Sequence, residues 1–202
     1  MITPSARMKR VRKKSSFSSA KAGHVRIIAG QWRGRKLPVT DVQGLRPTTD
    51  RNKETLFNWL MQDIQQTRCL DVFAGSGGLG LEALSRYADY CLFFEKDKNA
   101  ARQLAANLQA LSAKADVMQG DALTLLARQT APFDIIFVDP PFHQQLVNPA
   151  LTLIQQHQLV TPGSFIYIEQ EPNVPGPDLP DNWEIIRQKQ TSGLRYMLVE
   201  VV

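Results

Sequence analysis

The sequence predicts an α/β fold in which a mostly parallel sheet of seven strands ends in a C-terminal antiparallel hairpin. Two features carry this prediction. Between residues 69 and 169, short apolar runs that suit buried strands alternate with segments of helical periodicity, and such alternation is typical of a parallel sheet. After the proline-rich segment 172–180, two more apolar runs are joined through Thr191-Ser192-Gly193, which is typical of a hairpin and requires one antiparallel strand.

Two short strands and a helix are expected ahead of the alternating part. Val25–Gly30 and Lys36–Thr40 are predicted strands, and they flank Gln31-Trp32-Arg33-Gly34-Arg35, a basic hairpin tip with an aromatic residue. The helix that follows can be capped by Thr48, Thr49 or Asp50. Its apolar face is expected to carry Leu56, Phe57, Leu60, Met61 and Ile64.

The alternating part supplies the remaining elements in order. Apolar runs predict strands at 69–73, 90–95, 115–118, 135–138, 164–169, 183–188 and 194–201. Helices are expected between them at 79–87, 98–111, 122–128 and 145–157. The second of these helices has a regular apolar stripe formed by Ala101, Leu104, Ala105, Leu108 and Leu111.

Charge is distributed unevenly along the chain. Residues 1–54 contain 14 lysines and arginines against 3 acids, whereas the remainder contains 10 against 16. A basic front end on an acidic domain indicates a polyanionic partner, which we expect to be nucleic acid. We therefore divide the chain into a disordered basic arm (1–23), a β-hairpin extension (24–45) that is expected to bind RNA, and the α/β domain (46–202). The arm also resembles an organelle transit peptide, because it is rich in Arg and Ser and lacks acids.

The composition excludes several other classes of protein. No apolar run approaches the roughly 20 residues of a membrane span, and no secretory signal peptide is recognisable among the 202 residues. Cys69 and Cys91 both begin apolar runs and are interpreted as buried hydrophobic residues. A cytoplasmic, reducing location is therefore expected, with no metal site and no membrane partner.

The most informative motif follows the apolar run 135–138. Asp139-Pro140-Pro141-Phe142 places two prolines where the strand ends, and they hold a stiff loop at the carboxyl edge of the sheet. The carboxylate and the proline carbonyls can accept hydrogen bonds from an amino group, while the phenylalanine ring can stack on a planar base. The motif resembles the Asp/Asn-Pro-Pro-aromatic loop of methyltransferases that modify exocyclic amino nitrogens.

A glycine-rich loop predicts a cofactor site. Gly75, Gly77 and Gly80 satisfy G-x-G-x-x-G after the first strand of the alternating part, and Glu95 ends the next strand. This spacing also fits a dinucleotide fold, so NAD is an alternative. Asp71 favours another ligand, since a carboxylate there suits an ammonium group and repels a pyrophosphate.

Taken with Asp121 after the third strand and the Pro-Pro loop after the fourth, these motifs resemble those of class I, Rossmann-like S-adenosylmethionine methyltransferases. The resemblance implies that Asp71, Gly75 and Gly77 hold the methionine part of S-adenosylmethionine, Glu95 the ribose and Asp121 the adenine. The other cofactor contacts that it implies are Phe73, Lys96 and Ala122. The catalytic residues that it implies are Asp139, Pro140, Pro141 and Phe142.

The chain between about 25 and 200 is also similar to a narrower group, the bacterial family that methylates N2 of a guanine in small-subunit (16S) ribosomal RNA. The segments 26–38 and 45–51 carry this similarity. It implies small-subunit ribosomal RNA, within the assembling subunit, as partner. The RNA-binding residues expected from it are Arg33, Arg35, Lys36, Arg46, Thr48 and Arg51.

Two other functions remain open at this point. A DNA adenine-N6 methyltransferase shares the Asp-Pro-Pro-aromatic loop, but only about 20 residues separate Phe142 from the next strand, which leaves no room there for a domain that reads DNA. The second alternative is a non-catalytic RNA-binding module on an inactive Rossmann domain.

Overall fold

The computed structural model describes residues 23–40 and 50–202. The predicted arm, apart from Gly23, and the predicted RNA contacts Arg46 and Thr48 lie outside the described residues. Within the described ranges, no helix has both the length and the apolar character needed to cross a membrane.

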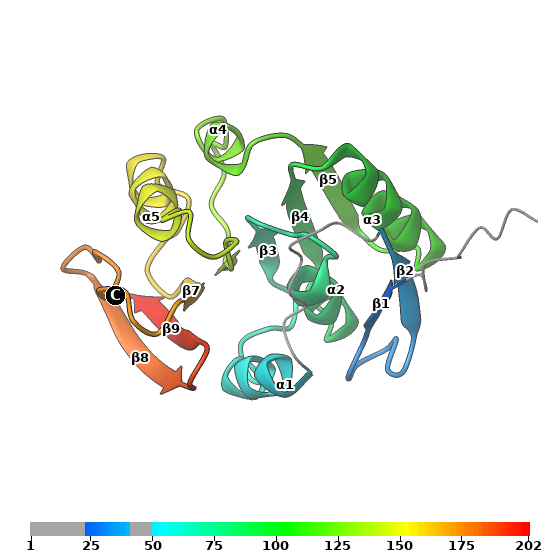
Figure 1. The fold of residues 1–202 in the computed structure, drawn as a ribbon, viewed down its shortest axis with the longest axis horizontal. Coiled ribbons are helices and arrows are strands. Elements are labelled where there is room, and N and C mark those ends of the chain that lie inside the picture. The colour runs from blue at the N-terminus through cyan, green and yellow to red at the C-terminus, as the bar shows by residue number, and fades with distance from the viewer. Residues whose placement is uncertain (1–22, 41–49) are drawn as a thin grey trace, which may run out of the picture.

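A seven-stranded sheet forms the centre of the molecule, as predicted (Figure 1). Its strand order is β5-β4-β3-β6-β7-β9-β8. Neighbouring strands from β5 to β7 are parallel, whereas β9 runs antiparallel to both β7 and β8. The strands are β3 (Arg68–Asp71), β4 (Tyr90–Glu95), β5 (Ala115–Gln119), β6 (Ile135–Val138), β7 (Phe165–Gln170), β8 (Trp183–Gln190) and β9 (Arg195–Val201).

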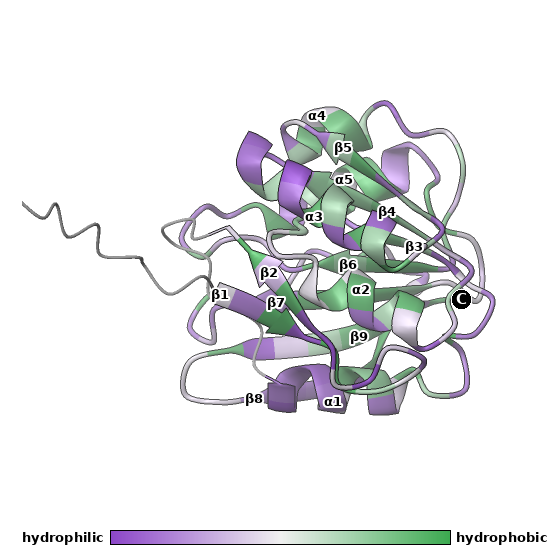
Figure 2. Cartoon of the chain, turned by 90° about the vertical axis from the view of Figure 1, so that its right-hand side faces the viewer, coloured by the Kyte–Doolittle hydropathy of each residue, from purple (hydrophilic) through white to green (hydrophobic). Residues whose placement is uncertain are grey.

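Helices cover both faces of the sheet, and each face has its own apolar cluster. The helices are α1 (Asp50–Trp59), α2 (Gly78–Ser85), α3 (Lys98–Ala110), α4 (Ala122–Leu126) and α5 (Val147–Gln156). One cluster joins α1, α2 and α3 to the sheet through residues such as Phe57, Leu104 and Phe137. The other lies under α4 and α5, around Leu126 and Ile154. Figure 2 shows the resulting pattern, with hydrophobic strands inside and hydrophilic outer helix surfaces.

Two details of the predicted helix faces are wrong. Met61 is 63% exposed, because α1 ends at Trp59 and the chain leaves the helical spiral before Met61. Ala105 on α3 is exposed as well, and Asn107 is buried in the stripe instead. The Asn107 side chain donates a 2.9 Å hydrogen bond to the carbonyl of Pro38, because the N-terminal hairpin covers this part of α3.

The N-terminal hairpin is a separate two-stranded sheet. It pairs β1 (Gly23–Arg26) with β2 (Lys36–Val39) in antiparallel register, with Arg26 opposite Lys36. The first strand is shorter than the predicted Val25–Gly30, since the amide groups of Ile28 and Ala29 bind a side chain of α2 rather than a neighbouring strand.

Candidate active site

A cavity of about 690 Å³ opens at the carboxyl edge of the sheet. The ends of β3, β4, β6 and β7 meet there, as expected for parallel strands, and β1 and α1 close one side. Of the predicted site residues, the wall includes Asp71, Phe73, Gly75, Glu95, Lys96, Asp121, Ala122, Asp139, Pro140, Pro141 and Phe142. The structure therefore brings the Pro-Pro loop and all of the predicted cofactor residues except Gly77 to one cavity.

The glycine loop between β3 and α2 is shaped by two different steric requirements. Gly77 has φ +78°, and a Cβ atom at this position would lie 2.5 Å from Leu104 Cδ1. A Cβ atom on Gly80 would lie 2.2 Å from Phe93 Cε1, so this glycine allows α2 to approach β4 closely. Gly77 does not line the cavity, and its observed role is to turn the chain.

Asp71 is a buried acid of the cavity wall, with 2% of its surface exposed. Its Oδ2 accepts a 3.0 Å hydrogen bond from the amide of Gly80. Burial raises the pKa of this carboxyl to about 7, against the lowering effect of the Gly80 hydrogen bond, and the charges of Asp139 and Glu95 raise it further. A cation bound in the cavity would favour the ionised form, so the site suits a positively charged ligand.

Two further acids stand at the ends of β4 and β5. Glu95 accepts a 2.6 Å hydrogen bond from the amide of Asp97, and burial raises the pKa of the Glu95 carboxyl. Asp121 is exposed and caps α4 by accepting a 3.1 Å hydrogen bond from the amide of Thr124, which lowers the pKa of Asp121. Both carboxylates lie on the cavity wall, and backbone amides hold each of them in position.

The Pro-Pro loop is rigid for reasons visible in its backbone. Pro140 is buried, and Phe142 is half-buried against the cluster under α1 to α3. His143 and Gln145 follow with φ values of +64° and +53°, which are uncommon for residues with side chains. The amide of His143 donates to the carboxylate of Glu171. Burial of Pro140 and the hydrogen bond to Glu171 thus hold the loop beside the cavity.

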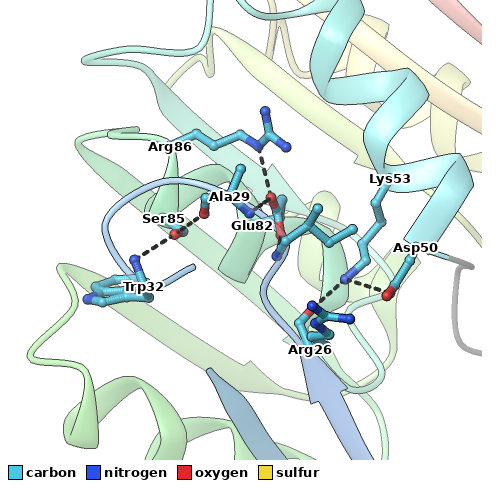
Figure 3. Close-up of polar contacts among 9 residues, drawn as sticks. Arg26, Ala29, Trp32, Asp50, Lys53, Glu82, Ser85 and Arg86 are labelled. Atoms are coloured by element: carbon cyan, nitrogen blue, oxygen red, sulfur yellow. Dashed lines mark hydrogen bonds and ion pairs between the residues drawn. The ribbon is translucent and has the colours of Figure 1, made fainter. Parts of the chain in front are cut away.

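The N-terminal hairpin is attached to α2 by buried side chains (Figure 3). Glu82, 1% exposed, accepts hydrogen bonds from the amides of Ile28 (2.8 Å) and Ala29 (3.0 Å) and from Nε of Arg86 (2.9 Å). The Ser85 hydroxyl donates to the carbonyl of Ala29 at 2.6 Å. These bonds hold the hairpin against the domain that contains the cavity.

The four predicted RNA-binding residues that the structure describes lie away from the cavity wall. Arg33, Arg35 and Lys36 are exposed on the hairpin, and Arg51 is exposed in the first turn of α1. Because the hairpin is fixed to α2, its three charges are presented at a constant position relative to the cavity.

Several residues of the cavity wall were not expected from the sequence. They include His24, Asn52, Lys53 and Glu169. Lys53 is buried and donates a 2.7 Å hydrogen bond to the carbonyl of Arg26, which ties α1 to the hairpin. Desolvation lowers the pKa of Lys53. Glu169 could have been found from the sequence, because it lies near the end of a predicted strand. Lys53 could not, because its burial results from a contact with a distant part of the chain.

The parallel part of the sheet is followed by an antiparallel strand, and the glycine loop, the strand-end acids and the Asp-Pro-Pro-Phe loop meet at one cavity. This combination of fold and site is that of a class I methyltransferase. Comparison with known proteins narrows this class. The model of the family described as conserved hypothetical protein 95 matches residues 25–200. The ribosomal RNA small subunit methyltransferase D of Haemophilus influenzae is 49% identical and covers 93% of this chain and 99% of its own length.

The protein of the same name from Escherichia coli is 47% identical, over 89% of this chain and 91% of its own. A solved structure, yhhF from Escherichia coli, gives a TM-score of 0.83 at 47% identity and covers 89% of this chain and 98% of that one. The chain therefore belongs to the family of the ribosomal RNA small subunit methyltransferase D proteins.

Proposed function

We propose that the protein transfers a methyl group from S-adenosylmethionine to the exocyclic N2 of a guanine in small-subunit (16S) ribosomal RNA, within the assembling subunit in the cytoplasm. The observation that carries the proposal is that one cavity is lined both by strand-end acids and by the Asp139–Phe142 loop. The names of the relatives support the class of substrate.

The acids of the cavity fit S-adenosylmethionine, which supplies the methyl group on a positively charged sulfonium. We assign the ammonium group to Asp71, because this carboxylate is buried at the end of β3 and lines the cavity together with Gly75. Glu95 would accept from the ribose hydroxyls, and Asp121 from the adenine amino group. This assignment follows the order of the strands along the edge of the sheet.

The Pro-Pro loop supports a direct role in activating the amine. The N2 lone pair of guanine is delocalised into the ring and is a weak nucleophile. Hydrogen bonds from N2–H to Asp139 and to the carbonyl of Pro140 would localise it and stabilise the positive charge that develops on nitrogen. Stacking of the base on Phe142 would offset roughly 1–3 kcal/mol of the cost of removing it from its stack. Asp139 can then take the proton.

The proposal is tested by incubating the protein with S-adenosylmethionine carrying a labelled methyl group and with total RNA and DNA from cells that lack it. We expect label in N2-methylguanosine of the small-subunit RNA. Label in N6-methyladenine of DNA would instead favour the DNA methyltransferase. Absence of transfer together with RNA binding would favour the non-catalytic module, and binding of NAD in place of S-adenosylmethionine would favour the dinucleotide-binding alternative.

The buried position of Asp71 predicts that cofactor affinity depends on pH. A carboxyl with a pKa of about 7 is mostly protonated at pH 6 and mostly ionised at pH 8. Since the ionised form binds the ammonium group, S-adenosylmethionine should bind about tenfold more tightly at pH 8 than at pH 6. Calorimetric titration measures this, and Asp71→Asn should weaken binding and flatten the pH dependence. Parallel pH profiles for the two proteins would contradict the role of Asp71.

The same shift gives a prediction for stability. The pKa of Asp71 is higher in the folded protein than in the unfolded chain, so the folded state binds more protons between about pH 4 and 7. The contribution of Asp71 to the free energy of unfolding is therefore fully present below pH 4 and is lost as the pH rises to 7. The free energy of unfolding, measured with urea at several pH values, should therefore fall between pH 4 and 7 more in the unaltered protein than in Asp71→Asn, which lacks the titrating carboxyl.

Charge on the hairpin is predicted to supply RNA affinity. Replacing Arg33, Arg35 and Lys36 together with glutamine should weaken RNA binding and reduce its salt dependence by about 0.7–0.9 in logarithmic slope for each phosphate that the variant no longer neutralises. The matched control replaces Arg128, Arg187 and Lys189, three exposed cations away from the hairpin, with glutamine. Equal losses in the two triple variants would assign the affinity to net charge alone.

A further inference from the structure

The cavity contains a carboxylate that the proposed chemistry does not use. Glu169 belongs to β7 and is 4% exposed, and it lines the cavity together with the Asp139–Phe142 loop. The hydroxyl of Tyr167 donates a 2.7 Å hydrogen bond to Glu169 Oε1. This bond orients the carboxylate from within the sheet. Glu169 therefore presents an oriented carboxylate on the wall of the cavity that the Asp139–Phe142 loop also lines.

Strand register brings Glu169 close to Asp139. In the parallel pair of β6 and β7, Val138 lies opposite Ile168, so Asp139 and Glu169 are the next residues at the same level. Neighbouring strands lie about 4.8 Å apart. Burial raises the pKa of Tyr167 well above its usual value, and the charges of Glu169 and Asp139 raise it further. The register therefore puts the two carboxylates side by side on adjacent strands.

This pair of carboxylates matches one base better than the others. The Watson–Crick edge of guanine presents two neighbouring donors, the ring N1–H and the exocyclic N2 amine. Adenine and cytosine also carry an exocyclic amine, but the ring nitrogen beside it is an acceptor. That acceptor would face a carboxylate oxygen and be repelled. A site with two adjacent carboxylates thus discriminates among bases that the Asp-Pro-Pro-Phe loop alone does not distinguish.

We propose that Glu169 accepts the N1–H of the target guanine while Asp139 and the carbonyl of Pro140 accept from its N2 amine, which makes Glu169 the residue that selects guanine. The inference rests on the proposed function and adds a determinant of substrate choice to it. A site that hydrogen-bonds a particular group rejects analogues that lack this group much more strongly than an apolar pocket does.

The test compares the unaltered full-length protein with Glu169→Gln, which keeps the shape of the side chain and an oxygen for the Tyr167 hydroxyl. Substrates are small ribosomal subunits from cells lacking the protein, and subunits in which the methylated guanosine has been mutated to adenosine. We expect Glu169→Gln to slow methylation of the guanosine by about 10- to 100-fold. The guanosine-to-adenosine rate ratio should fall at least about tenfold. The dissociation constant for S-adenosylmethionine should stay within about twofold.

Two controls separate base contact from packing. Tyr167→Phe removes the orienting hydroxyl but keeps the carboxylate, so it should slow methylation of the guanosine less than Glu169→Gln does. Glu184→Gln removes an exposed acid on β8 and should change nothing. If Glu169→Gln fails to fold, Glu169→Asp replaces it, because the shorter carboxylate withdraws from the base but keeps its charge. The same loss of guanosine rate and of selectivity is expected.

The outcome also separates this inference from the proposed function. An unaltered protein that does not form N2-methylguanosine would overturn the proposed function itself. A protein that forms it, with a Glu169→Gln rate within threefold or with an unchanged guanosine-to-adenosine ratio, would overturn the role of Glu169 alone. Loss of S-adenosylmethionine affinity in Glu169→Gln would do the same, because it would move Glu169 to the cofactor half of the cavity.

Discussion

Asp139→Ala is expected to abolish methyl transfer, with a fall in rate of at least about 1,000-fold. The carboxylate lies at the end of β6, directly before the two prolines, and lines the cavity. In the proposed mechanism this carboxylate accepts a hydrogen bond from the target amine, and alanine offers no replacement. Affinity for S-adenosylmethionine should change little, since Asp71, Glu95 and Asp121 remain in place. Single-turnover transfer and calorimetric titration measure the two quantities separately.

Asp139→Asn separates two roles of the same side chain. The amide oxygen of asparagine still accepts a hydrogen bond from the amine, but the group cannot take a proton at neutral pH. Activity well above that of Asp139→Ala would assign the main effect to hydrogen bonding, with solvent taking the proton. Activity of Asp139→Ala within a few-fold of the unaltered protein would remove Asp139 from the mechanism.

Local pattern predicted the sheet well because each parallel strand is a short buried run between clear breaks. The observed β4, Tyr90–Glu95, has the predicted bounds, and the antiparallel place of β9 followed from the hairpin turn at 191–193. Met61 and Ala105 were misplaced because helical periodicity does not show where a helix ends or what covers its outer face. Both errors arise from tertiary packing rather than from local preference.

Site residues at the ends of strands could be located from the sequence. Residues whose burial results from contacts with distant parts of the chain could not. Asp71 and Glu95 each end a strand and Asp139 directly follows one, so parallel topology alone places them at one edge. Lys53 and Glu82 had no such signal. A lysine and a glutamate in helices are ordinarily solvent-exposed, and only the docked hairpin, which supplies backbone partners to both, accounts for their burial.

The second large effect is expected from Glu82→Ala, which removes the contacts that hold the hairpin on α2. Glu82→Ala removes the buried acceptor of two hairpin amides and of Nε of Arg86, and leaves these half-buried donors without that partner. We expect the free energy of unfolding to fall by about 3–5 kcal/mol. The hairpin amides of Ile28 and Ala29 should lose protection from hydrogen exchange more than the amides of β3 and β4 do, because their bonds are the ones removed.

In this variant, methylation of RNA should be impaired because the hairpin is no longer fixed, whereas the cavity should still bind its cofactor. Below its unfolding temperature, Glu82→Ala should still bind S-adenosylmethionine but methylate small subunits poorly, since Arg33, Arg35 and Lys36 are no longer held at a constant position. Glu54→Ala, which removes an exposed acid on α1, is the matched control and should keep both activities. Full methylation by Glu82→Ala, with the amides of Ile28 and Ala29 unprotected, would mean that a fixed hairpin is dispensable for RNA recognition. Loss of cofactor affinity in parallel would instead mean that α2 transmits the damage to the glycine loop at its own N-terminus.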